Sequence, residues 1–153
     1  MKIGIADTNF ARVDMASFAL SVIKKNSNYG VERYTVPGMK DLPVACKILF
    51  EKYHCDITLA LGMAGPKPID KQCSHEASLG IQMAQIATNR HILEIFVHED
   101  EADTEKELFE IAKDRTEKHT FNALTLLEGK EALTKYAGMG KRQGKEDRGQ
   151  IIP

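Results

Sequence analysis

An aromatic side chain that follows the first apolar run is the first residue whose type and position could do chemistry. A ring at the carboxyl end of a parallel strand, such as Phe10, can stack on a flat heterocycle, with a gain of about 0.5–1.5 kcal/mol beyond the buried area. From spacing alone, the alternative is a phenylalanine that merely covers the adjacent helix. Phe10 is therefore a candidate contact for an aromatic ligand.

The sequence VPGMKDLP at 36–43 predicts a tight turn in front of a helix. Its proline limits φ and its glycine tolerates the left-handed region, so Met39, Lys40 and Asp41 would present main-chain groups to the edge of a sheet. Asp41 could also cap the helix that begins near Leu42, which is the default role for such a residue. One carboxylate could serve both as a cap and as a ligand contact.

A second short turn, GMAG at 62–65, ends the third apolar run. Met63 and Ala64 would expose a backbone edge there, and such N–H and C=O groups suit the edge of a heteroaromatic ring. The same glycine spacing is common in tight loops that bind nothing. Both common glycine-rich phosphate-binding motifs are missing from the sequence, which weakens a nucleotide-phosphate function.

A histidine at the expected start of the third helical pattern, about 74–89, is the candidate for proton transfer. The dipole near a helix N-terminus disfavours imidazolium, so His75 would be neutral and able to exchange protons near neutral pH. An exposed or capping histidine is the alternative. The zinc motif H-E-x-x-H is not completed after His75 or His98. The acids at 99–103 are explained by the helix that follows them, with a weak Mg²⁺ site as the alternative.

The elements that must position these residues follow from the alternation of apolar runs with longer helical patterns. This alternation predicts an α/β fold in three layers, with a four-stranded parallel sheet and helices on both faces. We expect one catalytic domain over 1–137 and a glycine-rich, charged tail over 138–153 that is ordered only if it docks. The expected strands are 3–6, 31–36, 56–61 and 92–97, and the expected helices are 42–53, about 74–89, 104 to about 127, and a short one at 130–137.

The bulk properties exclude several classes of protein. A chain of 153 residues with 42% hydrophobic residues suits one ordinary domain, and a formal charge of -1 favours neither nucleic acid nor a membrane surface as partner. The apolar runs are shorter than the ~20 residues of a membrane helix, and the strand-like start does not resemble a signal peptide. Three cysteines without a C-x-x-C pair indicate reduced thiols. We therefore expect a cytoplasmic protein.

Together with DTNFARVDMA at 7–16 and RQGKEDRG at 142–149, the turns described above resemble the archaeal type of riboflavin synthase, a relative of lumazine synthase. The resemblance runs nearly end to end. It implies a flavodoxin-like subunit that forms homopentamers, with sites between neighbouring subunits and no organic cofactor. It also implies that two molecules of 6,7-dimethyl-8-ribityllumazine exchange a four-carbon unit, which yields riboflavin and 5-amino-6-(D-ribitylamino)uracil.

The resemblance also implies roles for particular residues. Phe10, with Ala11 beside it, would stack on one ring, while Met63 and Ala64 would hold the edge of that ring. The turn at 39–41 would bind the ring system, and its Asp41 would accept hydrogen bonds from ribityl hydroxyls. The phosphate loop of lumazine synthase is replaced here by GPKPIDKQC at 65–73, so His75 is a nearby substitute for the relatives' catalytic histidine.

Two other functions and one structural role also fit the sequence. The chain could be a lumazine synthase, although its phosphate-binding features are missing. It could also be a flavin- or lumazine-binding protein that does not consume its ligand. The charged tail, including Lys141 and Arg142, could close over a neighbouring site.

Overall fold

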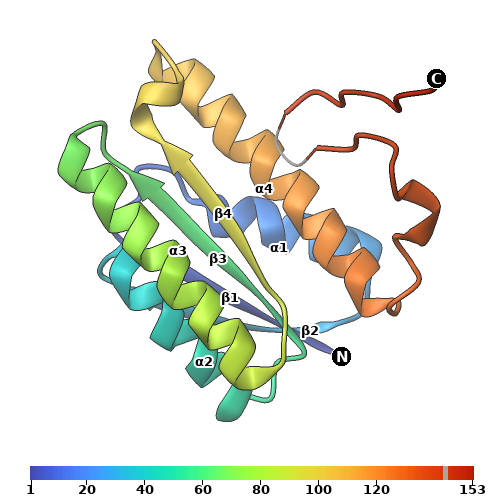
Figure 1. The fold of residues 1–153 in the computed structure, drawn as a ribbon. Coiled ribbons are helices and arrows are strands. Elements are labelled where there is room, and N and C mark those ends of the chain that lie inside the picture. The colour runs from blue at the N-terminus through green and yellow to red at the C-terminus, as the bar shows by residue number, and fades with distance from the viewer. Residues whose placement is uncertain (143–144) are drawn as a thin grey trace.

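The computed structural model describes residues 1–142 and 145–153, so the part of the expected tail at 143–144 lies outside the described residues. The fold is α/β, as predicted. Four parallel strands, in the spatial order β2-β1-β3-β4, form one sheet between two layers of helices (Figure 1). The strands are β1 (Lys2–Thr8), β2 (Gly30–Val36), β3 (Ile57–Ala64) and β4 (Ile92–His98).

Helices α1 (Met15–Asn26) and α4 (Glu105–Leu127) cover one face of the sheet, and α2 (Leu42–Glu51) and α3 (Pro68–Thr88) cover the other (Figure 1). Three short 3₁₀ helices connect these elements: η1 (Met39–Asp41), η2 (Glu99–Glu101) and η3 (Thr134–Tyr136). In the part of the chain that the structure describes, no helix combines the length and the apolar character needed to cross a membrane.

The central strand β3 is buried at every position, as expected for a parallel strand that is covered on both faces. Its side chains alternate between the two layers, so Met63 packs in the core beneath α1 and α4, whereas Ala64 faces α2 and α3. The strand was expected to end at Leu61, but it continues to Ala64. Met63 and Ala64 are therefore strand residues and do not form a loop.

Helix α3 begins at Pro68, earlier than the expected start near Ser74. The proline occupies the first turn, and the Asp70 carboxylate accepts a hydrogen bond from the Lys67 N–H at 3.1 Å. His75 consequently lies inside the helix. The dipole argument for this histidine is wrong, because the influence of a helix terminus falls off within the first turn.

Helices α2 and α3 approach each other closely at one glycine. A Cβ atom added to Gly80 would lie 2.7 Å from Cγ of Pro43, which is in the first turn of α2. A proline ring cannot swing away as a flexible side chain can. The two helices are therefore packed backbone against ring at this position.

The carboxyl-terminal part departs from the expected helix at 130–137. This stretch forms turns around η3, while the described residues of 138–153 contain no helix or strand. The expected end of the preceding long helix near Leu127 is confirmed. The division into a domain and a tail stays a prediction.

Candidate active site

The sheet opens between β1 and β3 at its carboxyl edge. Their ladder runs from Ile3 paired with Ile57 to Ala6 paired with Ala60, whereas β3 continues to Ala64. From β1 the chain passes to β2, and from β3 it passes to β4 on the other side of the sheet. The opening is thus the point where the strand order switches direction, which is where ligands bind in open α/β sheets.

A hollow of about 220 Å³ lies beside this opening, on the side of α2 and α3. Five of the residues that the sequence predicted for substrate binding line it, and they come from the loops after β1 and β2 and from the end of β3. The structure therefore brings together most of the predicted site. The lining residues are Phe10, Gly38, Met39, Lys40, Asp41, Ala64, Gly65, Asp70 and Cys73.

The turn after β2 is held by its own side chains and by α3. Asp41 accepts a hydrogen bond from the Gly38 N–H at 3.1 Å and makes no side-chain capping bond to α2. Asp41 therefore occupies the N-cap position of α2, as expected, but its carboxylate does not cap the helix. Lys40 Nζ lies 2.6 Å from Glu76 of α3. This hydrogen-bonded ion pair raises the pKa of Lys40 and lowers the pKa of Glu76, so both stay charged at neutral pH.

The loop that carries Phe10 is fixed at both ends. Asp7 accepts hydrogen bonds from Arg33 Nη2 at 2.6 Å and from the Thr35 hydroxyl at 2.7 Å. The same Arg33 nitrogen lies 3.3 Å from Asp14, at the far end of the loop. Phe10 itself is 58% exposed. A fixed backbone with a free ring face is suited to stacking on a flat ligand.

Three of the predicted residues do not line the hollow. Ala11 donates its N–H to the Thr8 hydroxyl at 3.3 Å and lines a separate cavity of about 290 Å³ on the other side of the loop. The side chain of Met63 is in the core, so only its main chain could meet a ligand. His75 is exposed on α3. The roles of these residues stay predictions.

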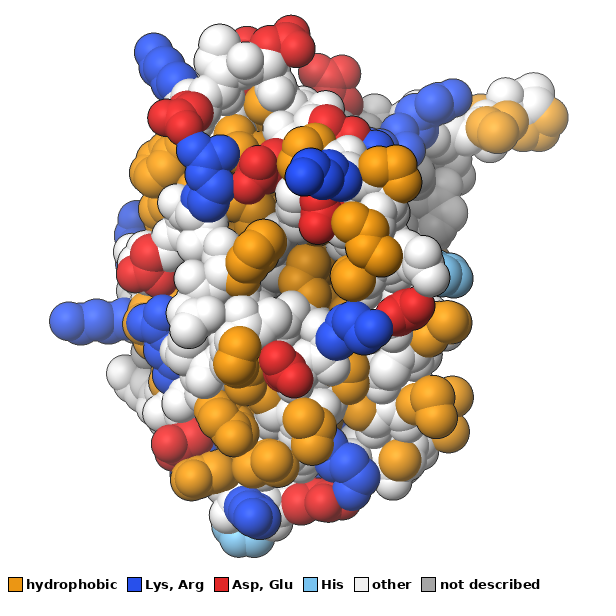
Figure 2. Space-filling view, turned by 90° about the vertical axis from the view of Figure 1, so that its left-hand side faces the viewer, with side chains coloured by type: hydrophobic (Ala, Val, Ile, Leu, Met, Phe, Trp, Pro, Cys, Tyr) orange, Lys and Arg blue, Asp and Glu red, His pale blue; other side chains and the backbone are white. Residues whose placement is uncertain are grey.

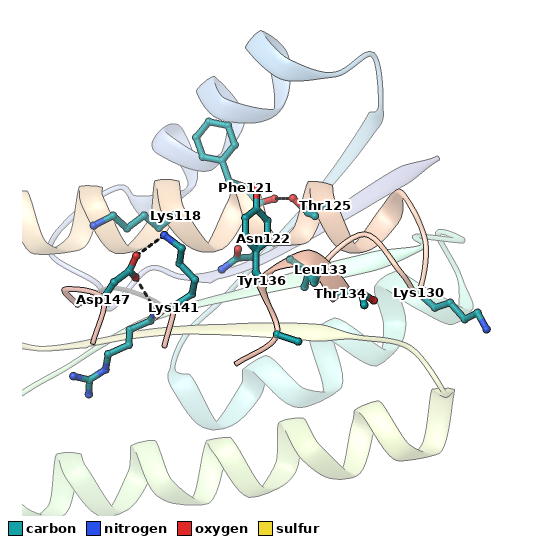
Figure 3. A pocket seen from close by; sticks show the side chains of 12 residues that line it. Lys118, Phe121, Asn122, Thr125, Lys130, Leu133, Thr134, Tyr136, Lys141 and Asp147 are labelled. Carbon is teal, nitrogen blue, oxygen red and sulfur yellow. Dashed lines mark hydrogen bonds and ion pairs between the residues drawn. The ribbon is translucent and has the colours of Figure 1, made fainter. Parts of the chain in front are cut away.

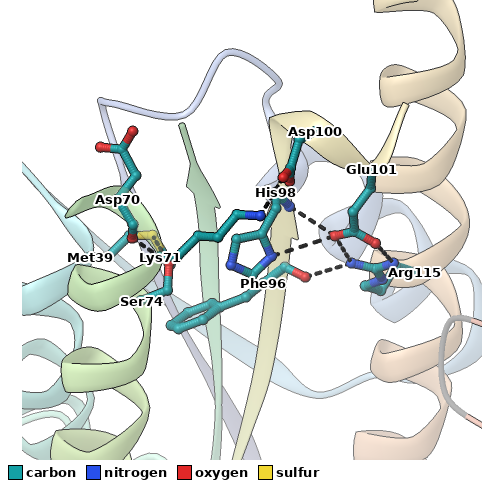
Figure 4. Close-up of polar contacts among 9 residues, drawn as sticks. All are labelled: Met39, Asp70, Lys71, Ser74, Phe96, His98, Asp100, Glu101 and Arg115. Carbon is teal, nitrogen blue, oxygen red and sulfur yellow. Dashed lines mark hydrogen bonds and ion pairs between the residues drawn. The ribbon is translucent and has the colours of Figure 1, made fainter. Parts of the chain in front are cut away.

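A group that sequence reasoning missed lies at the carboxyl end of β4 (Figure 4). Glu101 of η2 accepts hydrogen bonds from both terminal nitrogens of Arg115, at 2.8 and 2.6 Å, and from the His98 N–H at 2.8 Å. The Arg115 hydrogen bond is the largest cause that lowers the pKa of Glu101 to about 2. The carboxylate therefore stays ionised and lies 3.6 Å from Nδ1 of His98.

Three of the four acids that were expected to offer a weak Mg²⁺ site have cationic partners instead, Glu101 with Arg115 among them. Glu99 lies 3.5 Å from Arg12, and Asp100 pairs with Lys71 of α3. Within residues 1–142 and 145–153 there is no group of three or more His, Cys, Asp or Glu side chains that could hold a metal ion. A need for Mg²⁺ stays a prediction that turnover before and after treatment with EDTA would test.

The strand order and the hollow at its switch point define a flavodoxin-like α/β protein. The chain belongs to the 6,7-dimethyl-8-ribityllumazine synthase family, whose model matches residues 1–131. It is also similar to proteins named riboflavin synthase. Those from Methanothermobacter thermautotrophicus and Methanothermobacter marburgensis are 50% and 51% identical to it, and the one from Archaeoglobus fulgidus is 45% identical. Each match covers 99% of both chains.

Proposed function

We propose that this chain is a riboflavin synthase of the archaeal type, a transferase that moves a four-carbon unit between two molecules of 6,7-dimethyl-8-ribityllumazine. The products are riboflavin and 5-amino-6-(D-ribitylamino)uracil. The observation that carries this proposal is the match over 99% of the chain to proteins of that name at 45–51% identity. The hollow supports it, because the residues that line it suit a flat heterocycle with a polar chain.

The geometry suggests how the chain would favour this reaction. The C7 methyl group of the substrate is acidic, because its carbanion delocalises into the heterocycle, so a strong base is unnecessary. Holding two rings in register can lower the activation barrier by about 7–11 kcal/mol at best. Phe10 stacks on one ring, the turn at 39–41 holds its ribityl chain, and Ala64 offers main-chain groups to its edge. Positioning is then the main contribution of the protein, and no organic cofactor is needed.

One incubation tests the proposal. Purified protein supplied with 6,7-dimethyl-8-ribityllumazine alone should release riboflavin, detected by its fluorescence, with two substrate molecules consumed for each riboflavin. Consumption of a pyrimidine diamine and dihydroxybutanone phosphate, without riboflavin formation, would instead identify a lumazine synthase. Binding of the lumazine without its consumption would identify a binding protein. Either result would contradict the proposal.

The proposed assembly is a homopentamer with sites at the subunit interfaces. Its support is a row of apolar side chains on the outer face of α3. Leu79 is 48% exposed, Met83 71% and Ile86 83%, and Figure 2 shows apolar groups over much of this side of the molecule. Their spacing places them along one side of the helix. Exposed apolar groups gathered in this way are typical of surfaces that bind another protein.

Acidic substitutions on this row should disrupt the assembly. We expect the double variant Met83→Glu with Ile86→Glu to sediment as a smaller species and to lose most of its turnover, because two buried charges would face the neighbouring subunit. Tyr53→Glu, at an exposed aromatic beyond the end of α2, should leave both properties unchanged. Analytical ultracentrifugation with activity assays checks this. A wild-type monomer that is fully active in dilute solution would contradict the interface sites.

The tail is also assigned a role in the assembly. In the single chain, Lys141 Nζ and the Arg142 N–H meet Asp147 at 2.6 and 3.0 Å, and these residues line a cavity of about 820 Å³ against α4 (Figure 3). We predict that the segment closes over a neighbouring site. Normal kinetics after removal of the chain from Lys141 onward would exclude this role.

The three free cysteines support a cytoplasmic location, which fractionation of the source cells would check.

A further inference from the structure

The proposed reaction needs a group that takes a proton from the C7 methyl, and the charged side chains that line the hollow are poorly suited to it. Lys40 is paired with Glu76. The carboxylates of Asp41 and Asp70 accept hydrogen bonds from main-chain N–H groups of their own turns. A proton acceptor is therefore to be sought among the side chains immediately beside the hollow.

His98 occupies such a position. It is the register partner of Ala64, which lines the hollow, and β3 and β4 are adjacent parallel strands. Register partners point to the same face of a sheet, and adjacent strands lie about 4.8 Å apart. The side chain of His98 therefore stands one strand beyond the wall of the hollow, on the side of α3.

Phe96, two residues before His98 on the same face of β4, extends the wall of the hollow. A Cβ atom added to Gly62 would lie 2.8 Å from Cε of Met39 and 3.0 Å from the ring of Phe96. Met39 lines the hollow, so the Phe96 side chain of β4 extends over Gly62 toward the hollow. Figure 4 shows Met39 beside α3 and His98 on the side of β4, with the Phe96 ring and the Lys71 side chain between them.

The imidazole of His98 also has the partner that a proton carrier requires. Its Nδ1 atom lies 3.6 Å from the Glu101 carboxylate, which Arg115 holds in place through two hydrogen bonds. The Arg115 side chain is only 12% exposed, and its Nη1 also donates to the Phe96 carbonyl at 2.7 Å. A fixed carboxylate on one side of an imidazole orients the ring and stabilises the imidazolium that forms on proton uptake.

We infer that His98 is the residue that transfers the proton of the C7 methyl, with Glu101 as its positioning residue. The inference rests on the proposed function. The Nε2 lone pair takes the methyl proton, and the electron pair of the C–H bond moves into the heterocycle. The imidazolium then returns the proton to the ring system as the four-carbon unit is passed on, so that the residue ends the cycle neutral.

The other four histidines are less suitable. His54 and His91 precede β3 and β4 and so lie at the opposite edge of the sheet. His119 is 6% exposed in the core. His75 is the competitor, because it lies on α3 between Lys71, which pairs with Asp100, and Ser78. Among the described residues its ring forms no ion pair with a carboxylate, and the neighbouring Glu76 is paired with Lys40.

The test compares alanine variants at these histidines. We expect His98→Ala to lower kcat by roughly a hundred- to ten-thousandfold, the contribution of a positioned acid-base group, with KM within about threefold. Free imidazole should restore part of the lost rate. Enzyme-dependent hydrogen–deuterium exchange at the C7 methyl, followed by NMR, should slow in parallel, because it requires the same proton transfer. Equal melting temperatures would show that the variant is folded.

Three further variants make the result decisive. His91→Ala, at the opposite edge of the sheet, should behave as wild type, and Glu101→Gln should lower kcat about tenfold without rescue by imidazole. His75→Ala should lose less activity than His98→Ala. The inference is overturned if His98→Ala keeps kcat within about threefold, or if only His75→Ala shows a rescued loss. A wild-type protein that forms no riboflavin would instead contradict the proposed function.

Discussion

Phe10→Ala should weaken binding of 6,7-dimethyl-8-ribityllumazine by roughly thirtyfold and leave the fold almost unchanged. The ring is 58% exposed in the free chain, so its removal costs the fold little. A stacked heterocycle would cover the wild-type ring. The variant would therefore lose about 0.5–1.5 kcal/mol of ring-ring interaction together with the transfer energy of the covered area. A sum of about 2 kcal/mol corresponds to that factor in affinity.

Fluorescence titration with the substrate measures this effect, and thermal unfolding measures the stability. Phe10→Trp keeps an aromatic face and should stay within about threefold of the wild-type affinity. Tyr53→Ala provides the matched control, because this ring is 44% exposed and does not line the hollow. If Phe10→Ala and Tyr53→Ala bound the substrate equally well, Phe10 would not be a ligand contact.

Acidification from pH 6.5 to pH 4 should remove about 3 kcal/mol of stability through one buried histidine. Burial, followed by the nearby charge of Arg115, lowers the pKa of His119 from 6.5 to about 4. Its Nδ1 atom is buried without a hydrogen-bond partner among the described residues. Between these two pH values His119 takes up a proton in the unfolded chain but not in the folded chain. Stability that is complete above pH 6.5 is therefore lost as the pH falls toward 4, at about 1.36 kcal/mol per pH unit.

His119→Leu should remove this part of the acid sensitivity. We expect its free energy of unfolding to fall less steeply than that of the wild type between pH 6.5 and 4, as measured by urea unfolding at several pH values. At pH 7 the variant should be as stable as the wild type or slightly more stable, because it no longer buries an unpaired polar atom. His91→Gln, at an exposed histidine, should keep the wild-type slope. Parallel curves for the wild type and His119→Leu would contradict the explanation.

Most of the fold could be predicted because its strands and helices correspond to local patterns of apolar residues in the sequence. The four apolar runs became the four strands, and the stripe from Leu42 onward became α2. The start of α3 was missed because two prolines and several charged residues at 65–73 look like a loop. The available signals were Pro68, which suits a first helical turn, and Asp70, which can bond back to the Lys67 N–H.

The site was predictable where its residues follow the ends of parallel strands or share one local motif. Met39, Lys40 and Asp41 form one turn, so a single motif located all three at the hollow. The setting of His98 depends instead on Arg115, which reaches Glu101 from a different helix. No spacing rule connects an arginine in the middle of α4 with the end of β4. Contacts of this kind become visible only when the tertiary structure is known.

The close approach of Gly80 to Pro43 joins α2 and α3 into one rigid block. The turn that lines the hollow precedes α2, and the apolar row lies on α3, so the packed pair of helices connects the two surfaces. In the proposed assembly, occupancy of the hollow and self-association would be thermodynamically linked. Dilution below the dissociation constant of the assembly should then weaken affinity for the lumazine, and saturating lumazine should favour the assembled state.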